Sequence, residues 1–425
     1  MAREKFLSIK LLAESMFGEI HRIFWLIIAV GFLGGLTGAG YLKIMWMLQT
    51  KLGPAAWGPW PHVILMGATG LLIGLLTLYL GDPGNVELLV NNIHLLGGNE
   101  DIRQLRSLIP TSLISIAAGG AVGPEAPLVQ TTGSIGTWLA ERCHLPVQDK
   151  RILTITGMAA GLTVLFGSPL GAAIFALEIL HRRGMEYYEA LLPAVLGSLA
   201  GYAVFVAATG LDLAPIWSFP EMAPLTRSDI GWSVVIGVLA AAIAGLFTYL
   251  NLGLRWVFQW IPPLVRPVLG GVLLGLLAFW SPYALTFGES QITAIATAHL
   301  ASGMFLVAAL AKLLGSSLTL ASDWKGGFII PLFFIGAAFG QMVHGLFPQS
   351  NQVVIMSALM AGLLTGVTKT PLGSTVVVTE MAGLQLLPTT LIAAVISLLL
   401  TSEVGLIDTQ RARDPGKTLP NPEAS

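Results

Sequence analysis

Charged side chains are scarce in this chain. Asp, Glu, Lys and Arg make up 11% of its 425 residues, whereas an ordinary soluble domain carries about 25%. Hydrophobic residues make up 54%, and the formal net charge is −1. This composition excludes a soluble globular domain and is typical of a polytopic membrane protein. The near-neutral balance also argues against a nucleic-acid or polybasic partner.

Cysteine is nearly absent as well. Cys143 is the only one in the sequence, so no intrachain disulfide can form. The chain lacks His-Glu-x-x-His and Gly-x-Ser-x-Gly, the sequences typical of zinc and serine hydrolases. These absences argue against a membrane enzyme, and nothing in the sequence calls for a metal ion or a cofactor.

Long apolar runs dominate what is present. A membrane-spanning helix needs about 20 apolar residues. The clear runs are Ile23–Leu48, His62–Leu80, Tyr188–Ala208, Ile230–Leu252, Val268–Trp280, Met304–Leu320 and Leu386–Leu400. Others, such as Ile152–Phe166 and Leu170–Leu180, are short or glycine-broken, which favours tilted or half-spanning helices packed inside protein. The sequence therefore predicts an all-α polytopic membrane protein with tilted and broken transmembrane helices.

Basic residues flank the apolar region at both ends. They are Arg3, Lys5, Lys10 and Arg22 before the first run, and Arg411, Arg413 and Lys417 after the last. By the positive-inside rule both ends are expected in the cytoplasm. We expect a cytoplasmic segment over 1–22, a multi-pass domain over 23–408 in the inner (plasma) membrane, and a short tail over 409–425 without a regulatory domain.

Three groups of small residues recur about 200 positions later in the same order. Gly84-Asn85 returns as Gly288-Glu289. Gly123, Pro127 and Gly136 return as Gly327, Pro331 and Gly340, and Pro169-Leu170-Gly171 with Glu178 returns as Pro371-Leu372-Gly373 with Glu380. The halves fall at about 23–208 and 228–408. A parallel duplication is one interpretation; an inverted repeat, whose broken helices converge on a site near the membrane midplane, is the other.

Glu125 is the most informative residue of these motifs. It lies in the apolar segment Gly-Pro-Glu-Ala-Pro at 123–127, where an ionisable group is costly. The N–H groups at a helix start attract anions, and a carboxylate is one. We therefore expect Glu125 to occupy an anion site that a mobile anion also seeks, and so to act as a gate and a proton carrier.

The motifs in this order resemble the CLC family of anion channels and anion/proton exchangers, over roughly Ile23 to Asp408. The 123–127 segment is similar to the family's G-[KR]-E-G-P, without its basic residue and second glycine, and the segment 326–331 is similar to G-G-x-F-x-P. The resemblance implies a CLC-type inverted repeat and a homodimer with one pore per subunit. It makes Glu125 the gating glutamate. It also implies an anion site at Gly123, Ala126 and Gly327 and at the N–H groups of Phe328 and Ile329.

Three departures from the family pattern narrow the resemblance. Asn85 stands where chloride-type members have a serine. The last tyrosine of the chain is Tyr283, so the family's central tyrosine is absent. Ile179 stands where chloride exchangers have an inner proton-relay glutamate. Together these features resemble the fluoride-exporting clade. An Asn85 amide offers a donor to a small, strongly hydrated anion; a packed, hydrogen-bonded interior amide is the alternative.

The sequence thus predicts a fluoride/proton antiporter that exports fluoride, with inorganic anions, protons and the lipid bilayer as its partners. A chloride channel or chloride/proton antiporter is the nearest alternative. Most of the other polar residues have two interpretations each. Glu178 and Glu380 either serve a vestibule or pair structurally with an arginine or a helix start. Glu289 complements a helix dipole, Thr368 and Thr370 line the pathway or cap a helix, and His94 either titrates or makes a satisfied polar contact.

Overall fold

The computed structural model describes residues 2–84, 90, 93–94, 98, 102–185, 187–210, 216–407 and 409–412; for residues 2–21, 183 and 411–412 it describes the backbone alone. Asn85 lies outside the described residues.

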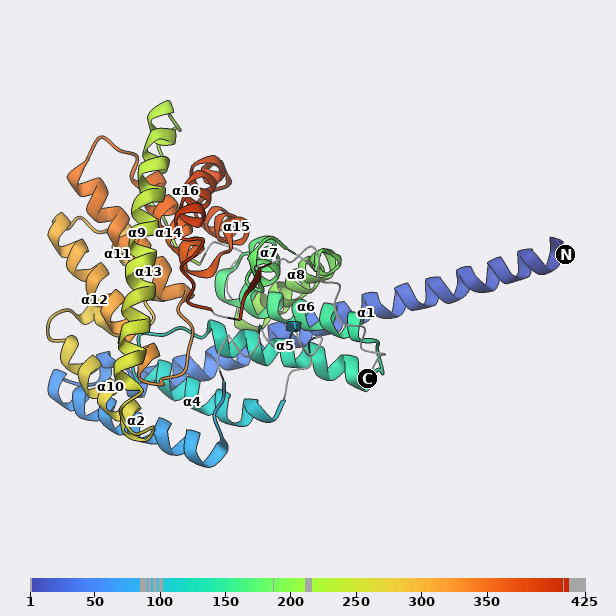
Figure 1. Ribbon diagram of the computed structural model, residues 1–425, viewed down its shortest axis with the longest axis horizontal. Coiled ribbons are helices and arrows are strands. Elements are labelled where there is room, and N and C mark those ends of the chain that lie inside the picture. The colour runs from blue at the N-terminus through green and yellow to red at the C-terminus, as the bar shows by residue number, and fades with distance from the viewer. Residues whose placement is uncertain are drawn as a thin grey trace.

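The described chain is almost entirely helical. The helices of the first half are α1 (Ala2–Leu52), α2 (Pro59–Leu80), α4 (Leu105–Ala117), α5 (Glu125–Arg142), α6 (Val147–Phe166), α7 (Pro169–Glu178) and α8 (Leu191–Thr209). Those of the second are α9 (Arg227–Phe258), α10 (Val265–Leu277), α11 (Glu289–Thr297), α12 (Ser302–Ala321), α13 (Ile329–Leu346), α14 (Gln352–Thr368), α15 (Pro371–Ala382) and α16 (Leu387–Leu400). Figure 1 shows α9 to α14 on one side of the molecule, with α2 of the first half packed beside α10, and α5 to α8 next to them.

Within the described residues, six helices are long and apolar enough to cross a membrane. They lie at Arg22–Ala56, Pro59–Leu80, Tyr188–Thr209, Arg227–Phe258, Ser302–Ala321 and Ile329–Leu346. Shorter apolar helices, such as α7, α10 and α14, are packed among them. The predicted polytopic all-α fold with broken helices is confirmed.

The two ends of the domain differ in detail from the sequence expectation. α1 is continuous from Ala2 to Leu52, so the expected boundary at 22 falls inside a helix. At the other end, strand β2 (Arg411–Ala412) pairs in parallel with β1 (His181–Arg183), which follows α7. The buried Gln410 amide also donates to the carbonyls of Ile179 and Thr368, at 2.9 and 2.7 Å. The start of the 409–425 segment is therefore attached to the helices.

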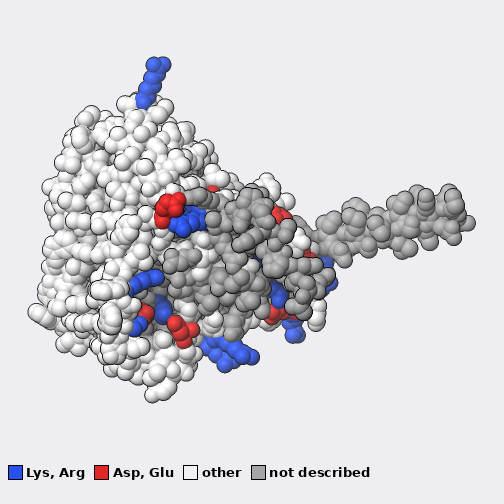
Figure 2. All heavy atoms as spheres, viewed as in Figure 1, with Lys and Arg blue, Asp and Glu red and all other residues white. Residues whose placement is uncertain are grey.

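The surface fits a lipid environment. In Figure 2 one broad side of the molecule is almost free of charge, and the blue and red atoms lie in a few small groups. Exposed aromatic side chains gather where α2 begins and α10 ends: Trp60 and Phe279 pack with their ring centroids 4.9 Å apart, beside Trp280. Aromatic side chains of this kind prefer the boundary between lipid and water.

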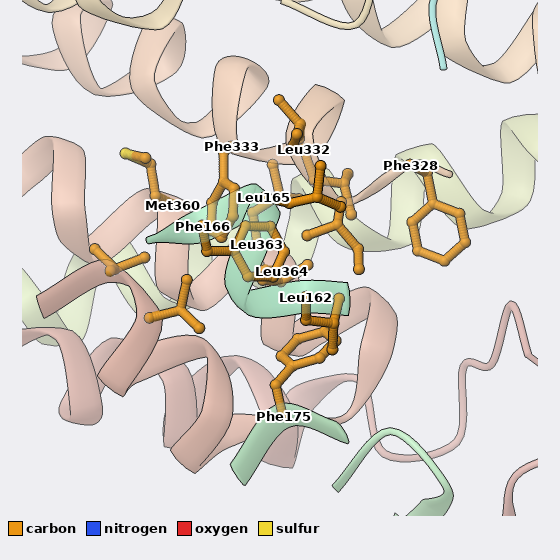
Figure 3. Packing of buried hydrophobic residues seen from close by; sticks show 14 of the residues in the cluster. Leu162, Leu165, Phe166, Phe175, Phe328, Leu332, Phe333, Met360, Leu363 and Leu364 are labelled. Atoms are coloured by element: carbon orange, nitrogen blue, oxygen red, sulfur yellow. The ribbon is translucent and has the colours of Figure 1, made fainter. Parts of the chain in front are cut away.

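The main hydrophobic core joins the two halves. Leu162, Phe166 and Phe175 come from α6 and α7, and Phe333 and Met360 come from α13 and α14. Figure 3 shows these side chains packed together, with Phe328 pointing away to one side. The Phe166 and Phe333 rings meet edge to face at 5.8 Å, an arrangement that aromatic pairs favour.

Two glutamates, Glu178 buried and Glu380 partly buried, connect the halves reciprocally. Glu178, at the end of α7, accepts the N–H groups of Leu372 and Gly373 at 3.2 and 2.6 Å, where α15 begins. Glu380, near the end of α15, accepts the Gly171 N–H at 2.9 Å and the Ser168 hydroxyl, where α7 begins. Each carboxylate thus satisfies the free N–H groups at the start of the other helix. The structural interpretation of Glu178 and Glu380 is confirmed, with a helix start as the partner.

Replacing Glu178 or Glu380 by alanine should destabilise the protein by about 1–3 kcal/mol each, because buried N–H groups lose a charged acceptor. The melting temperature of the detergent-solubilised protein measures this. Glu141→Ala is the matched control. Its carboxylate is 47% exposed and pairs with Lys150 at 3.1 Å, and such surface pairs contribute little. An unchanged melting temperature for Glu178→Ala would contradict the capping role.

The structure also gives the contacts or positions of His94, Glu289 and Thr370. The ring nitrogens of His94 contact the Tyr187 hydroxyl and the Leu180 carbonyl at 3.0 and 2.6 Å, so the satisfied polar contact is confirmed. Glu289 is the first residue of α11, as its dipole role requires. Thr370 stands at the N-cap position of α15 but makes no capping bond, so of its two interpretations the helix cap is wrong. The Glu178 carboxylate caps this helix instead, and the Thr370 hydroxyl bonds Ser374.

Candidate functional site

The two halves meet at their glycine motifs. Gly123 and Gly327, which are equivalent residues of the two repeats, form an isolated antiparallel β-bridge. The Gly123 N–H donates to the Gly327 carbonyl at 2.8 Å, and the Gly327 N–H donates to the Gly123 carbonyl at 2.6 Å. Together with the reciprocal glutamate caps, this exchange between equivalent positions fits a two-fold relation between the halves. It also places the starts of α5 and α13 next to each other.

Glu125 occupies this meeting point. It is the first residue of α5 and is 1% exposed. One carboxylate oxygen, Oε1, accepts the N–H of Ile330 in the first turn of α13. The other, Oε2, has no hydrogen-bond partner among the described residues. The side chain of one repeat is therefore bound at the helix start of the other, where free N–H groups favour negative charge.

The two bridging glycines make room for this carboxylate. A Cβ atom on either Gly123 or Gly327 would lie 2.3 Å from Glu125 Oε2. Real side chains do not come so close, so any other residue at either position would displace the carboxylate or the backbone. The position of the Glu125 carboxylate therefore requires glycine at both 123 and 327.

A small apolar cavity lies on one side of Glu125. Its volume is about 30 Å³, and it is lined by Glu125, Ala126, Gly327, Phe328 and Ile329 together with Val90, Val129, Met158, Leu162, Phe175 and Ile179. A site of this size admits about one or two water-sized occupants. Ile179, the residue at the place of the family's inner glutamate, contributes an apolar wall to it.

A larger, charged cavity lies next to the start of α5, and we call it the vestibule. Its volume is about 260 Å³; it is lined by Arg255, Arg266, Lys325, Asp323, Gln130, Gln259, Gly84, Leu108, Phe258, Leu320, Ala321, Trp324, Ala126, Pro127 and Gly326. Ala126 lines both cavities, so the two lie next to each other at the start of α5. The lining carries more cationic than anionic side chains, which raises the local concentration of anions.

Two ion pairs involve cationic side chains that line the vestibule. Arg266 contacts the Asp323 carboxylate at 3.3 Å, and Lys325 contacts the Asp82 carboxylate at 3.1 Å. Partial burial raises the pKa of Asp82, but the Lys325 ammonium and the Gly84 N–H outweigh it and hold that pKa below its usual value. Asp82 is therefore ionised at neutral pH, as its contact with Lys325 requires.

The structure brings together most of the residues that the sequence predicts for the anion site and the gate. Ala126, Gly327, Phe328 and Ile329 line the small cavity with Glu125, and Gly123 forms the bridge beside it. Asn85 is outside the described residues, but its neighbour Gly84 lines the vestibule.

Ile330 is the residue that the sequence interpretation misses. Its N–H contacts Glu125, although the motif resemblance points to Phe328 and Ile329. Because α13 begins at Ile329 with Phe328 as its N-cap, the N–H of Ile330 is also one of the free N–H groups of its first turn. Among the described residues, no group of three or more His, Cys, Asp or Glu side chains is placed to hold a metal ion.

Comparisons with known proteins agree with this geometry. The voltage gated chloride channel family matches residues 86–402. The chloride/fluoride channel protein of Pseudomonas syringae pv. tomato is 26% identical over 419 residues, covering 94% of this chain and 89% of that protein. The H(+)/Cl(-) exchange transporter ClcA of Cronobacter sakazakii is 27% identical over 384 residues, covering 83% and 80%.

A solved structure has the same fold. The crystal structure of a CLC-type fluoride/proton antiporter superposes with a TM-score of 0.82 at 24% sequence identity, and the match covers 93% of this chain and 99% of that one. The family match extends over most of the chain, including α5, α13 and the bridge between them. The protein is therefore a multi-pass membrane protein of the voltage gated chloride channel (CLC) family, an anion transporter and not an enzyme.

Proposed function

We propose that this protein is a fluoride/proton antiporter that exports fluoride from the cytoplasm, with Glu125 as its gate and proton carrier. The observation that carries the proposal is the position of the Glu125 carboxylate. Glu125 lines the small apolar cavity, is followed directly by Ala126, which also lines the vestibule, and accepts a helix-start N–H group of the opposite repeat. A mobile anion that reaches the same N–H groups competes with this carboxylate.

The transport cycle follows from this competition. While the carboxylate is bound at Ile330, it blocks passage between the two cavities. An arriving anion displaces it, and the displaced glutamate accepts a proton. The anion then leaves in one direction, and the proton is released in the other when the carboxylate returns. The proposed anion site consists of Asn85, Gly123, Ala126, Gly327, Phe328 and Ile329, next to the Ile330 N–H that the carboxylate occupies. Backbone dipoles hold the anion without a full cationic charge, so it can also leave.

Fluoride is the anion that three sequence features favour. Asn85 replaces the serine of chloride-type members, no tyrosine follows Tyr283, and Ile179 replaces the inner glutamate. Ile179 contributes an apolar wall to the cavity beside Glu125, so Glu125 is the proton carrier of the pathway. The Pseudomonas relative's name and the similar antiporter structure both include fluoride. We further propose a homodimer with both termini in the cytoplasm.

Chloride/proton exchange is the second candidate, because the Cronobacter relative carries that name at a similar identity. The experiment is efflux from proteoliposomes that contain the purified protein and are loaded with fluoride or with chloride, recorded with electrodes selective for each anion. The proposal predicts fluoride efflux well above that of chloride. Chloride leaving as fast as fluoride would contradict the fluoride assignment and leave the gate intact.

A further inference from the structure

Asn251 is a buried amide without a partner. It lies on α9 with no exposed area, and neither its Nδ2 nor its Oδ1 has a hydrogen-bond partner among the described residues. Both atoms of the amide group form hydrogen bonds in water, so leaving them bare in the interior is unfavourable. A buried polar group of this kind calls for an explanation, and its position relative to the vestibule supplies one.

The neighbouring turns of α9 place Asn251 between the vestibule and Phe328. One turn before it, Phe247 contacts the Phe328 ring at a centroid distance of 6.3 Å. One turn after it, Arg255 lines the vestibule, and so does Phe258 one turn further on. Residues four apart lie on the same side of a helix, about 6 Å apart along its axis. Asn251 is therefore one turn inside the vestibule on the side of α9 that faces the core.

A second helix carries unpartnered polar groups at a corresponding position. α12 packs against α9, and its last residues, Leu320 and Ala321, line the vestibule together with Arg255. About one turn back from them, Ser316 and Ser317 are fully buried, and neither hydroxyl has a partner among the described residues. Both helices thus carry buried polar groups without a described hydrogen-bond partner about one turn away from the residues that line the vestibule.

We propose that Asn251, with the hydroxyl groups of Ser316 and Ser317, forms an intermediate binding site for a small inorganic anion between the vestibule and the Glu125 gate. This inference rests on the proposed function. The amide N–H₂ and the hydroxyl groups are donors that replace part of the water around an arriving fluoride ion. No lysine or arginine belongs to this set, so the anion is bound without a full opposite charge and passes on to the gate.

Asn251→Leu tests the site, because leucine has a similar size and no donor. It should raise the fluoride concentration for half-maximal efflux roughly tenfold or more, the effect of losing a hydrogen bond to a charged group. The ratio of protons to anions should stay unchanged, since Glu125 is intact. Ser198→Ala is the matched control: it removes another fully buried, unpartnered hydroxyl, on α8, and should leave the half-maximal concentration as in the wild type.

A purely structural amide gives the opposite result. Asn251→Leu would then keep the wild-type half-maximal concentration and would raise the melting temperature, because it removes an unpaired polar group from the interior. That outcome would overturn the inference. If Asn251→Leu is not monodisperse after purification, the double variant Ser316→Ala/Ser317→Ala gives the same test with smaller changes in volume.

Failure of the proposed function gives a different result. Wild-type protein that moves chloride and no fluoride contradicts the fluoride assignment. The half-maximal chloride concentration of Asn251→Leu then tests the intermediate site by itself: a rise of similar size supports it, and an unchanged value overturns it.

Discussion

Glu125→Gln should abolish proton-coupled transport while leaving a passive anion flux. Glutamine keeps the size of the side chain and cannot exchange a proton. The neutral amide also lacks the negative charge that the Ile330 N–H and the helix start of α13 favour. We expect proton movement driven by an anion gradient to fall by roughly 100-fold or more, a loss typical of removing a positioned proton-transfer group. Simultaneous recordings with a pH electrode and an anion-selective electrode on proteoliposomes measure it.

Glu178→Gln is the control for this experiment. Glu178 is also a buried carboxylate bound to helix-start N–H groups, but its partners are Leu372 and Gly373, at the start of α15. This variant should lower the melting temperature and keep the proton coupling. If Glu125→Gln still moves protons against an anion gradient, the gate and carrier is another residue.

Gly123→Ala should displace the Glu125 carboxylate from its position at Ile330 while leaving the glutamate in the chain. The new Cβ atom would lie 2.3 Å from Oε2 and 2.6 Å from both Oε1 and Cδ of Glu125. The glutamate side chain is the group that can move, so the carboxylate leaves its place at Ile330. We expect a passive anion leak severalfold above that of the wild type, and a lower ratio of protons to anions. Anion efflux at zero proton gradient measures the leak.

Gly245→Ala is the matched control for this substitution. Gly245 lies within α9, and a Cβ atom there would have no neighbour within 4 Å, so the leak and the melting temperature should stay near their wild-type values. A Gly123→Ala protein that folds and couples protons as tightly as the wild type would show that the carboxylate does not need this place for coupling.

The centre of the site could be predicted because its residues leave local signals. An acidic residue among glycines and prolines in an apolar run indicates a helix start that carries an ionisable side chain whose burial is unfavourable. Glu125 is indeed the first residue of α5. The regular offset between the motifs pairs Gly123 with Gly327, and these two residues form the bridge. The Pro-Leu-Gly motifs mark the starts of α7 and α15, where the glutamates of the opposite repeat bind.

Contacts between distant elements could not be predicted in this way. The choice of Ile330 over Phe328 as the donor depends on where α13 begins, and helix ends are poorly defined by sequence pattern. The cationic side chains of the vestibule come from α9, from α10 and from the segment before α13, so no single motif joins them. Asn251 left one signal, a lone amide in the apolar run Ile230–Leu252, but its lack of a partner is visible only in the folded protein.

The most direct test of the central claim is uphill transport. Proteoliposomes containing the wild-type protein are prepared with equal fluoride concentrations inside and outside, and a proton gradient is then imposed across the membrane. A fluoride/proton antiporter driven through Glu125 must move fluoride away from equilibrium, toward the side with more protons, and the movement must disappear in Glu125→Gln. Fluoride that stays at equilibrium under the proton gradient, while it flows freely down its own gradient, would identify an uncoupled channel and contradict the account.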